Sequence, residues 1–101
     1  MNNDYMQEIG GMIKQVQEIT KKAVSLIEPQ VNAIIRNKMT DNNQIETLLD
    51  RLFDYAGMDE NGLILFKRLC RYYYGLNPKV TADYIYAYRD LYDSDKIDED
   101  D

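Results

Sequence analysis

Residues 9–35 read IGGMIKQVQEITKKAVSLIEPQVNAII, and apolar side chains recur along this stretch at steps of mostly three or four residues. An α-helix turns once in 3.6 residues, so this spacing places the apolar side chains along one side of a helix. The apolar row consists of Ile9, Met12, Ile13, Val16, Ile19, Ala23, Leu26, Ile27, Val31, Ile34 and Ile35. A row of this length has to be covered, and three shorter amphipathic segments follow it. The pattern therefore predicts an all-α protein, a small helical bundle.

Pro29 interrupts the apolar row. A proline inside a helix removes one backbone hydrogen bond and clashes with the preceding turn. Ser25 and Glu28 have the spacing of a capping box, which allows a second helix to start there. We therefore predict a long N-terminal helix that is kinked or broken near Pro29. Gly10 and Gly11 weaken its first turns by ~1 kcal/mol each relative to alanine.

Caps and breakers divide the rest of the chain into three shorter helices. Asp41 and Asp59 are suited to capping helix N-termini, and Asn77-Pro78 combines an N-cap with a proline at the first helical position. Gly57 and Gly75 follow apolar segments, and we expect Gly75 to end its helix in the left-handed conformation. The predicted helices span about residues 42–56, 60–74 and 78–92.

The predicted helices differ in length, and this difference constrains how they pack. At 1.5 Å per residue the N-terminal helix is ~50 Å long and each later helix ~20 Å. Short helices lying side by side cannot cover so long a row. Either the long helix folds back at Pro29, or the short helices stack end to end along it, or a second copy of the chain covers the remainder. The third solution predicts a homodimer formed through the N-terminal helix.

Most of the net charge of −6 is concentrated at the end of the sequence. Residues 93–101 hold six acidic residues and one lysine, a net charge of −5, which leaves −1 for residues 1–92. We expect one helical domain over residues 1–92 and an acidic, disordered tail over residues 93–101. A near-neutral body does not suit a protein that mimics nucleic acid.

The composition also predicts the compartment. No stretch approaches the ~20 apolar residues that cross a bilayer, and the first residues lack the pattern of a signal peptide. The single cysteine, Cys70, cannot form an internal disulfide and fits a reducing environment. We therefore expect a cytoplasmic protein without a membrane segment.

The residue types that most enzymes depend on are missing. The sequence has no histidine and one cysteine, so imidazole bases, histidine-dependent triads and zinc clusters are excluded. Glu46, Asp50 and Asp54 share a helix face, but helical di-iron sites also need a histidine three residues after a glutamate. We interpret the three carboxylates as a solvated face and Cys70 as an inert core thiol. We expect no enzyme activity, no cofactor and no metal.

Tyrosine is the unusual component, because seven of the nine tyrosines lie between residues 72 and 92. Three successive tyrosines cannot all face inward, since each step turns a helix by about 100°. Exposed tyrosines beside arginines are typical of protein interfaces, and they also suit nucleic acid. The alternative is a solvated face whose basic side chains lie over neighbouring rings. The predicted Tyr/Arg patch consists of Ile64, Lys67, Arg68, Arg71, Tyr72, Tyr74 and Tyr86.

Two functions follow from this patch. The first is a non-enzymatic interaction protein with a small accessory or regulatory role, which binds a protein partner or itself. The second is a DNA-binding regulator that uses residues 69–92 as a helix-turn-helix. Arg71 occupies the position where that motif usually has a small residue, and the second helix mixes acidic with basic side chains. The sequence therefore favours the protein interaction, with nucleic acid as the alternative.

Overall fold

The computed structural model describes residues 2–92, with side chains described from residue 5 onward. These residues form four helices and no strand, which confirms the predicted all-α bundle. The acidic tail predicted over residues 93–101 lies outside the described residues. The helices are α1 (Asn2–Arg36), α2 (Asn42–Ala56), α3 (Glu60–Tyr74) and α4 (Pro78–Tyr92).

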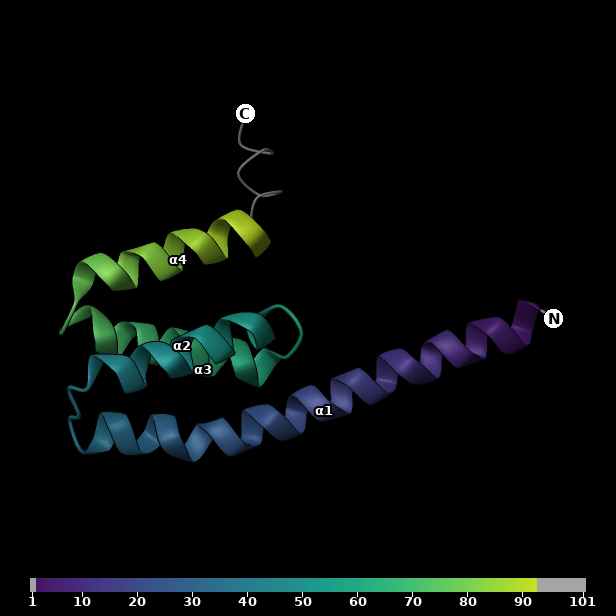
Figure 1. The fold of residues 1–101 in the computed structure, drawn as a ribbon, viewed down its shortest axis with the longest axis horizontal. Helices are drawn as coiled ribbons and strands as arrows, with labels where there is room; N and C mark the ends of the chain where they lie inside the picture. Colours follow the sequence, from purple (N-terminus) through teal and green to yellow (C-terminus); the bar gives the residue numbers. More distant parts are fainter. Residues whose placement is uncertain (1, 93–101) are drawn as a thin grey trace.

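Each helix runs antiparallel to the one before it (Figure 1). The pair α2–α3 lies at the centre, with α1 packed against it on one side and α4 on the other. Within residues 2–92, α1 and α4 do not touch. The three connections are short, so each helix starts beside the end of its predecessor and runs back along it.

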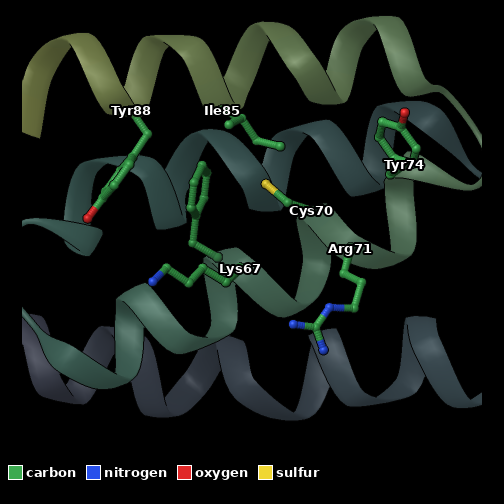
Figure 2. A pocket seen from close by; sticks show the side chains of 7 residues that line it. Lys67, Cys70, Arg71, Tyr74, Ile85 and Tyr88 are labelled. Carbon is green, nitrogen blue, oxygen red and sulfur yellow. The ribbon is translucent and has the colours of Figure 1, made fainter. Parts of the chain in front are cut away.

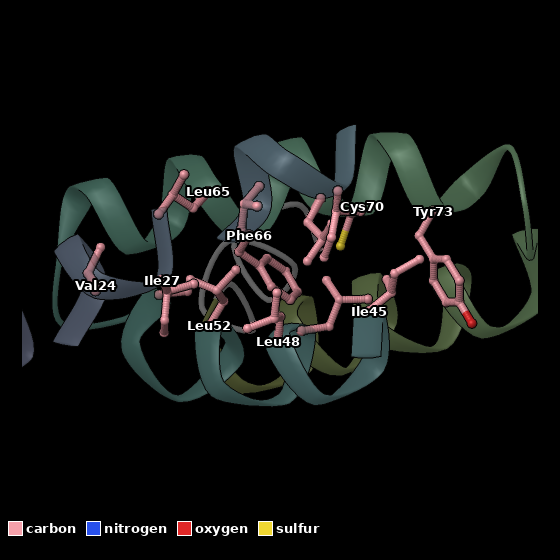
Figure 3. Close-up of a cluster of buried hydrophobic side chains, with 14 residues drawn as sticks. Val24, Ile27, Ile45, Leu48, Leu52, Leu65, Phe66, Cys70 and Tyr73 are labelled. Carbon is pink, nitrogen blue, oxygen red and sulfur yellow. The ribbon is translucent and has the colours of Figure 1, made fainter. Parts of the chain in front are cut away.

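The core lies where α1, α2 and α3 meet (Figure 3). α2 supplies five fully or nearly buried apolar side chains, and α3 supplies four together with the ring of Tyr73. α1 adds only side chains from its C-terminal half: Val24, Ile27, Val31 and Ile34. The one residue that α4 buries fully is Thr81, so α4 is held mainly by half-buried tyrosine rings.

α1 is one continuous helix that runs through both Gly10-Gly11 and Pro29. Of the two predicted alternatives the break is therefore wrong, and α1 changes direction only gently along its length (Figure 1). Ser25 does not cap a new helix; its hydroxyl donates to the carbonyl of Lys22 at 2.7 Å. Pro29 is tolerated because it lies on the exposed side of α1, where the carbonyl that loses its partner can bond to water.

The N-terminal half of α1 projects beyond the bundle (Figure 1). From Tyr5 to Ile19 every residue is exposed, and Thr20 is the first buried one. The helix neither folds back nor carries the short helices end to end. Along the apolar row, Ile13 and Val16 are 56% and 49% exposed, whereas Ile27 and Ile34 are buried. The other helices of the chain thus cover only the C-terminal half of the apolar row.

The starts of α2 and α3 agree with the sequence, but the end of α3 does not. Asp41 and Asp59 accept from the backbone N–H groups of Gln44 and Gly62, as N-caps do. Gly75 was expected in the left-handed conformation, and this prediction is wrong because its φ is −68°. The left-handed residue is Lys38 (φ 52°), between α1 and α2. After α3 the chain turns in right-handed conformation, with successive N–H groups bonded to the carbonyls of the last turn.

Position 57 requires glycine because the ring of Tyr92 lies against it. A Cβ atom at this position would overlap the ring of Tyr92, whose hydroxyl donates to the carbonyl of Phe53 at 3.1 Å. We expect Gly57→Ala to displace this ring and to lower the free energy of unfolding by about 1–3 kcal/mol, the usual cost of overpacking. Chemical denaturation monitored by circular dichroism measures the change. Gly10→Ala is the control, because a Cβ there meets nothing within 4 Å; equal stability of wild type and Gly57→Ala would contradict the prediction.

Candidate interaction surfaces

The residues of the predicted Tyr/Arg patch are spread over different sides of α3 and, in the case of Tyr86, over α4. Arg68 and Tyr72 are half-buried and turn toward α1 and the connection after it. The guanidinium of Arg68 donates to Oδ1 of Asn32 at 2.9 Å, and the hydroxyl of Tyr72 donates to the carbonyl of Met39 at 2.6 Å. These two side chains help to hold α1 against α3.

Lys67, Arg71 and Tyr74 line a groove between α3 and α4 (Figure 2). Arg71 also borders a smaller hollow that it shares with Arg68 and Tyr72. The groove has a volume of about 510 Å³. Phe66 and Cys70 contribute to its apolar lining from α3, and Ile85 and Tyr88 contribute from α4. The lining is therefore mainly apolar, and the charged end of Arg71 is directed away from α4 (Figure 2).

The remaining two residues of the predicted patch stay apart from this groove. Ile64 is 48% exposed on α3 and Tyr86 is 60% exposed on α4, and neither lines the groove. The structure thus brings three of the seven predicted residues together, uses two for packing and leaves two separate.

Tyrosine hydroxyls attach α3 and α4 to α2. Tyr73 donates to Oε2 of Glu46, and Tyr84 donates to Oδ1 of Asp50 at 2.6 Å. Burial raises the pKa of Tyr73, and the carboxylate of Glu46 raises it further. Burial and Asp50 likewise raise the pKa of Tyr84. Two of the three carboxylates that we interpreted as a solvated face, Glu46 and Asp50, therefore accept hydrogen bonds from tyrosine hydroxyls.

Cys70 is 5% exposed, and burial raises the pKa of its thiol to about 12. The thiolate, which is the nucleophilic form, is therefore strongly disfavoured at neutral pH. In the part of the chain that the structure describes, no three Cys, Asp or Glu side chains gather in a way that could hold a metal ion.

The projecting half of α1 carries a second regularity that the sequence analysis did not separate from the apolar row. Apolar residues alternate at steps of four and three, which is the a/d pattern of a coiled coil. We call this set the α1 seam: Tyr5, Ile9, Met12, Val16, Ile19, Ala23 and Leu26. Six of its members are between 38% and 66% exposed, and Ala23 is half-buried.

The α1 seam diverges from the side of α1 that faces the core. A strict seven-residue repeat drifts by about 20° per heptad around a straight helix. Near the bundle the seam therefore lies beside the buried side chains rather than among them, and Leu26 remains 63% exposed although its neighbour Ile27 is buried. Part of the seam also borders a groove of about 560 Å³ between α1 and the connection from α2 to α3, where Met58 is 51% exposed.

The hairpin of α3 and α4 differs from a helix-turn-helix in its arrangement. The two helices of that motif cross at roughly 90–120°, whereas α4 runs back alongside α3 (Figure 1). The exposed side of α4 carries Lys79 and Arg89 together with Asp83 and Asp90. The geometry adds nothing that favours DNA binding.

No protein family, characterised protein or solved structure matches this chain. Among the helices of residues 2–92, none is both long enough and apolar enough to cross a bilayer.

Proposed function

We propose that this protein is a non-enzymatic interaction protein that self-associates through the α1 seam, in a small accessory or regulatory role. The observation that carries the proposal is the projection of α1, which exposes large apolar side chains along several turns beyond the bundle. Exposed apolar surface of this extent is typical of an association site. The proposal moves the main interface from the Tyr/Arg patch to α1, because Arg68 and Tyr72 are already engaged within the chain.

The nature of the seam favours a helical partner. An a/d repeat fits the side chains of another helix with the same repeat. Among the helices of residues 2–92, α1 is the one that leaves such a repeat of large apolar side chains exposed over several turns, so a second copy of α1 is the matching partner. Covering a half-exposed Ile, Val or Met side chain yields roughly 1 kcal/mol, about half of the value for complete burial. Summed over two seams, this gain is of the same order as the loss of rotational and translational freedom on association. The dimer is therefore expected to dissociate on dilution.

The test is the dependence of molecular mass on concentration. Sedimentation of the wild-type chain from low micromolar to millimolar concentration should show a monomer that converts to a dimer. Ile19→Lys should keep the chain monomeric, because it places a charge in the seam at a position that is 61% exposed. Leu91→Lys is the matched control, since Leu91 is 60% exposed but lies on α4.

Circular dichroism should show the same helix content for both variants, so that loss of association is not loss of folding. A chain that stays monomeric to millimolar concentration would contradict the proposal. Equal weakening by the two lysine substitutions would also contradict it, because the interface would then not be specific to α1.

A further inference from the structure

One flank of the α1 seam, formed by the g positions of the repeat, carries opposite charges at equal distances from a central residue. With Ile9, Val16 and Ala23 at position a, the g positions that precede them are Glu8, Gln15 and Lys22. All three g residues are exposed. Glu8 and Lys22 lie seven residues to either side of Gln15, so reversing the direction of the helix exchanges the negative and the positive position.

We infer that the second copy pairs with α1 in the antiparallel direction, with a two-fold axis near residues 14 and 15; this inference rests on the proposed self-association. In an antiparallel pair the two rows of g residues lie on the same side of the seam. Glu8 then faces the partner's Lys22, Lys22 faces the partner's Glu8, and Gln15 meets its own copy. Charges at these flanking positions set the orientation of coiled coils.

The same register gives compatible apolar layers. In an antiparallel pair each a residue packs opposite a d residue, which places Ile9 opposite the partner's Ile19 and Val16 opposite the partner's Met12. Tyr5, the largest side chain of the seam, falls opposite Ala23, the smallest. On the other flank Ile13, at position e and 56% exposed, meets its own copy. The register therefore covers the exposed apolar side chains on the flank as well as in the seam.

A parallel pair, or an antiparallel pair in a shifted register, loses the pairing of Glu8 with Lys22. In a parallel pair each g residue faces the e residue five positions later, which places Glu8 opposite Ile13 and Lys22 opposite Ile27. Ile27 is 4% exposed because it belongs to the bundle core. An antiparallel pair shifted by one heptad places Glu8 opposite Pro29 or leaves Lys22 without an acidic partner. Only the register centred near residue 14 pairs both charges.

The orientation can be measured by crosslinking the full-length chain with a short bis-maleimide. Gln15→Cys should crosslink into a covalent dimer, because the two copies of this position are adjacent across the axis. Ile9→Cys is the matched variant for the opposite orientation. Its copies are adjacent in a parallel pair but ten residues, or ~15 Å, apart along the axis in the antiparallel one. The wild-type chain is the background control, since Cys70 is buried.

A charge exchange tests the register independently. Glu8→Lys and Lys22→Glu should each raise the dissociation constant about tenfold at low salt, because each turns two attractions into repulsions. The double variant Glu8→Lys/Lys22→Glu restores opposite charges at both contacts and should restore the wild-type constant. In molar salt the differences should largely vanish.

The outcomes separate the two proposals. A dimer by sedimentation that crosslinks at Ile9→Cys but not at Gln15→Cys, or a double variant no tighter than the single ones, would overturn the antiparallel register and leave self-association standing. A wild-type chain that is monomeric at every concentration would overturn both. Crosslinking at Gln15→Cys together with rescue by the double variant would support the antiparallel pair.

Discussion

Ile34→Ala is expected to lower the free energy of unfolding by about 2–5 kcal/mol, the range measured for removing a large buried aliphatic side chain. Ile34 is fully buried where α1 meets the core. The same substitution at Ile13, on the same helix and in the same apolar row, should change the stability of the monomer by less than about 0.5 kcal/mol, the usual effect of an exposed site. Urea denaturation of dilute protein, followed by circular dichroism, measures both.

The pair of variants also separates folding from association. The effect of Ile34→Ala should be present at every protein concentration, because this residue packs within its own chain. Any effect of Ile13→Ala should grow with concentration, because the proposed dimer covers this side chain. Equal losses of stability for the two variants in dilute solution would show that the N-terminal half of α1 packs against the bundle after all.

The sequence predicted the four helices because each has its own apolar face and the three shorter ones have their own N-caps. It did not show which part of the apolar row would be covered, because Ile13 and Ile34 have the same local pattern. Which half of the apolar row is covered depends on the short connection after Arg36. Because of this connection, α2 starts at the C-terminal end of α1 and runs back along it. α2 is 15 residues long, about 22 Å at 1.5 Å per residue, so its reach ends near the middle of α1.

The Tyr/Arg patch was less predictable than the helices. Helical phase indicates that Tyr72 and Tyr74 cannot both be buried with Tyr73, and both are indeed more exposed than Tyr73. Phase does not indicate that the hydroxyl of Tyr72 reaches the carbonyl of Met39, which is 33 residues away in the sequence. Side-chain partners on other helices decide which polar residues are available for binding, and periodicity within one helix does not contain that information.

One signal for the α1 seam was present in the sequence. The apolar row of residues 9–35 is wider than one packing face requires, since it contains neighbouring pairs such as Met12-Ile13 and Leu26-Ile27. In the second pair the structure buries Ile27 and exposes Leu26. A helix that contacts partners on two adjacent sides needs such pairs.

Raising the pH above 9 is expected to destabilise the fold progressively. The ordinary pKa of a cysteine is 9.0, and burial raises that of Cys70 to about 12. The tyrosine pKa of 10.0 is raised at Tyr73 and Tyr84 by burial and by a neighbouring carboxylate. The folded chain therefore keeps protons that the unfolded chain releases. Their stabilising contribution is complete below pH 9 and is lost as the pH rises toward the raised values.

The slope of this loss identifies the groups. A group that is protonated only in the folded chain contributes about −1.4 kcal/mol per pH unit to the free energy of unfolding. Cys70 acts alone between pH 9 and 10, and Tyr73 and Tyr84 add to the slope above pH 10. Urea denaturation at pH 7, 9, 10 and 11 measures the slope. Cys70→Ala should remove the loss below pH 10 and Tyr73→Phe should flatten the slope above it, whereas a free energy of unfolding that stays constant from pH 9 to 11 would contradict the hydroxyl contacts that hold α3 and α4 to α2.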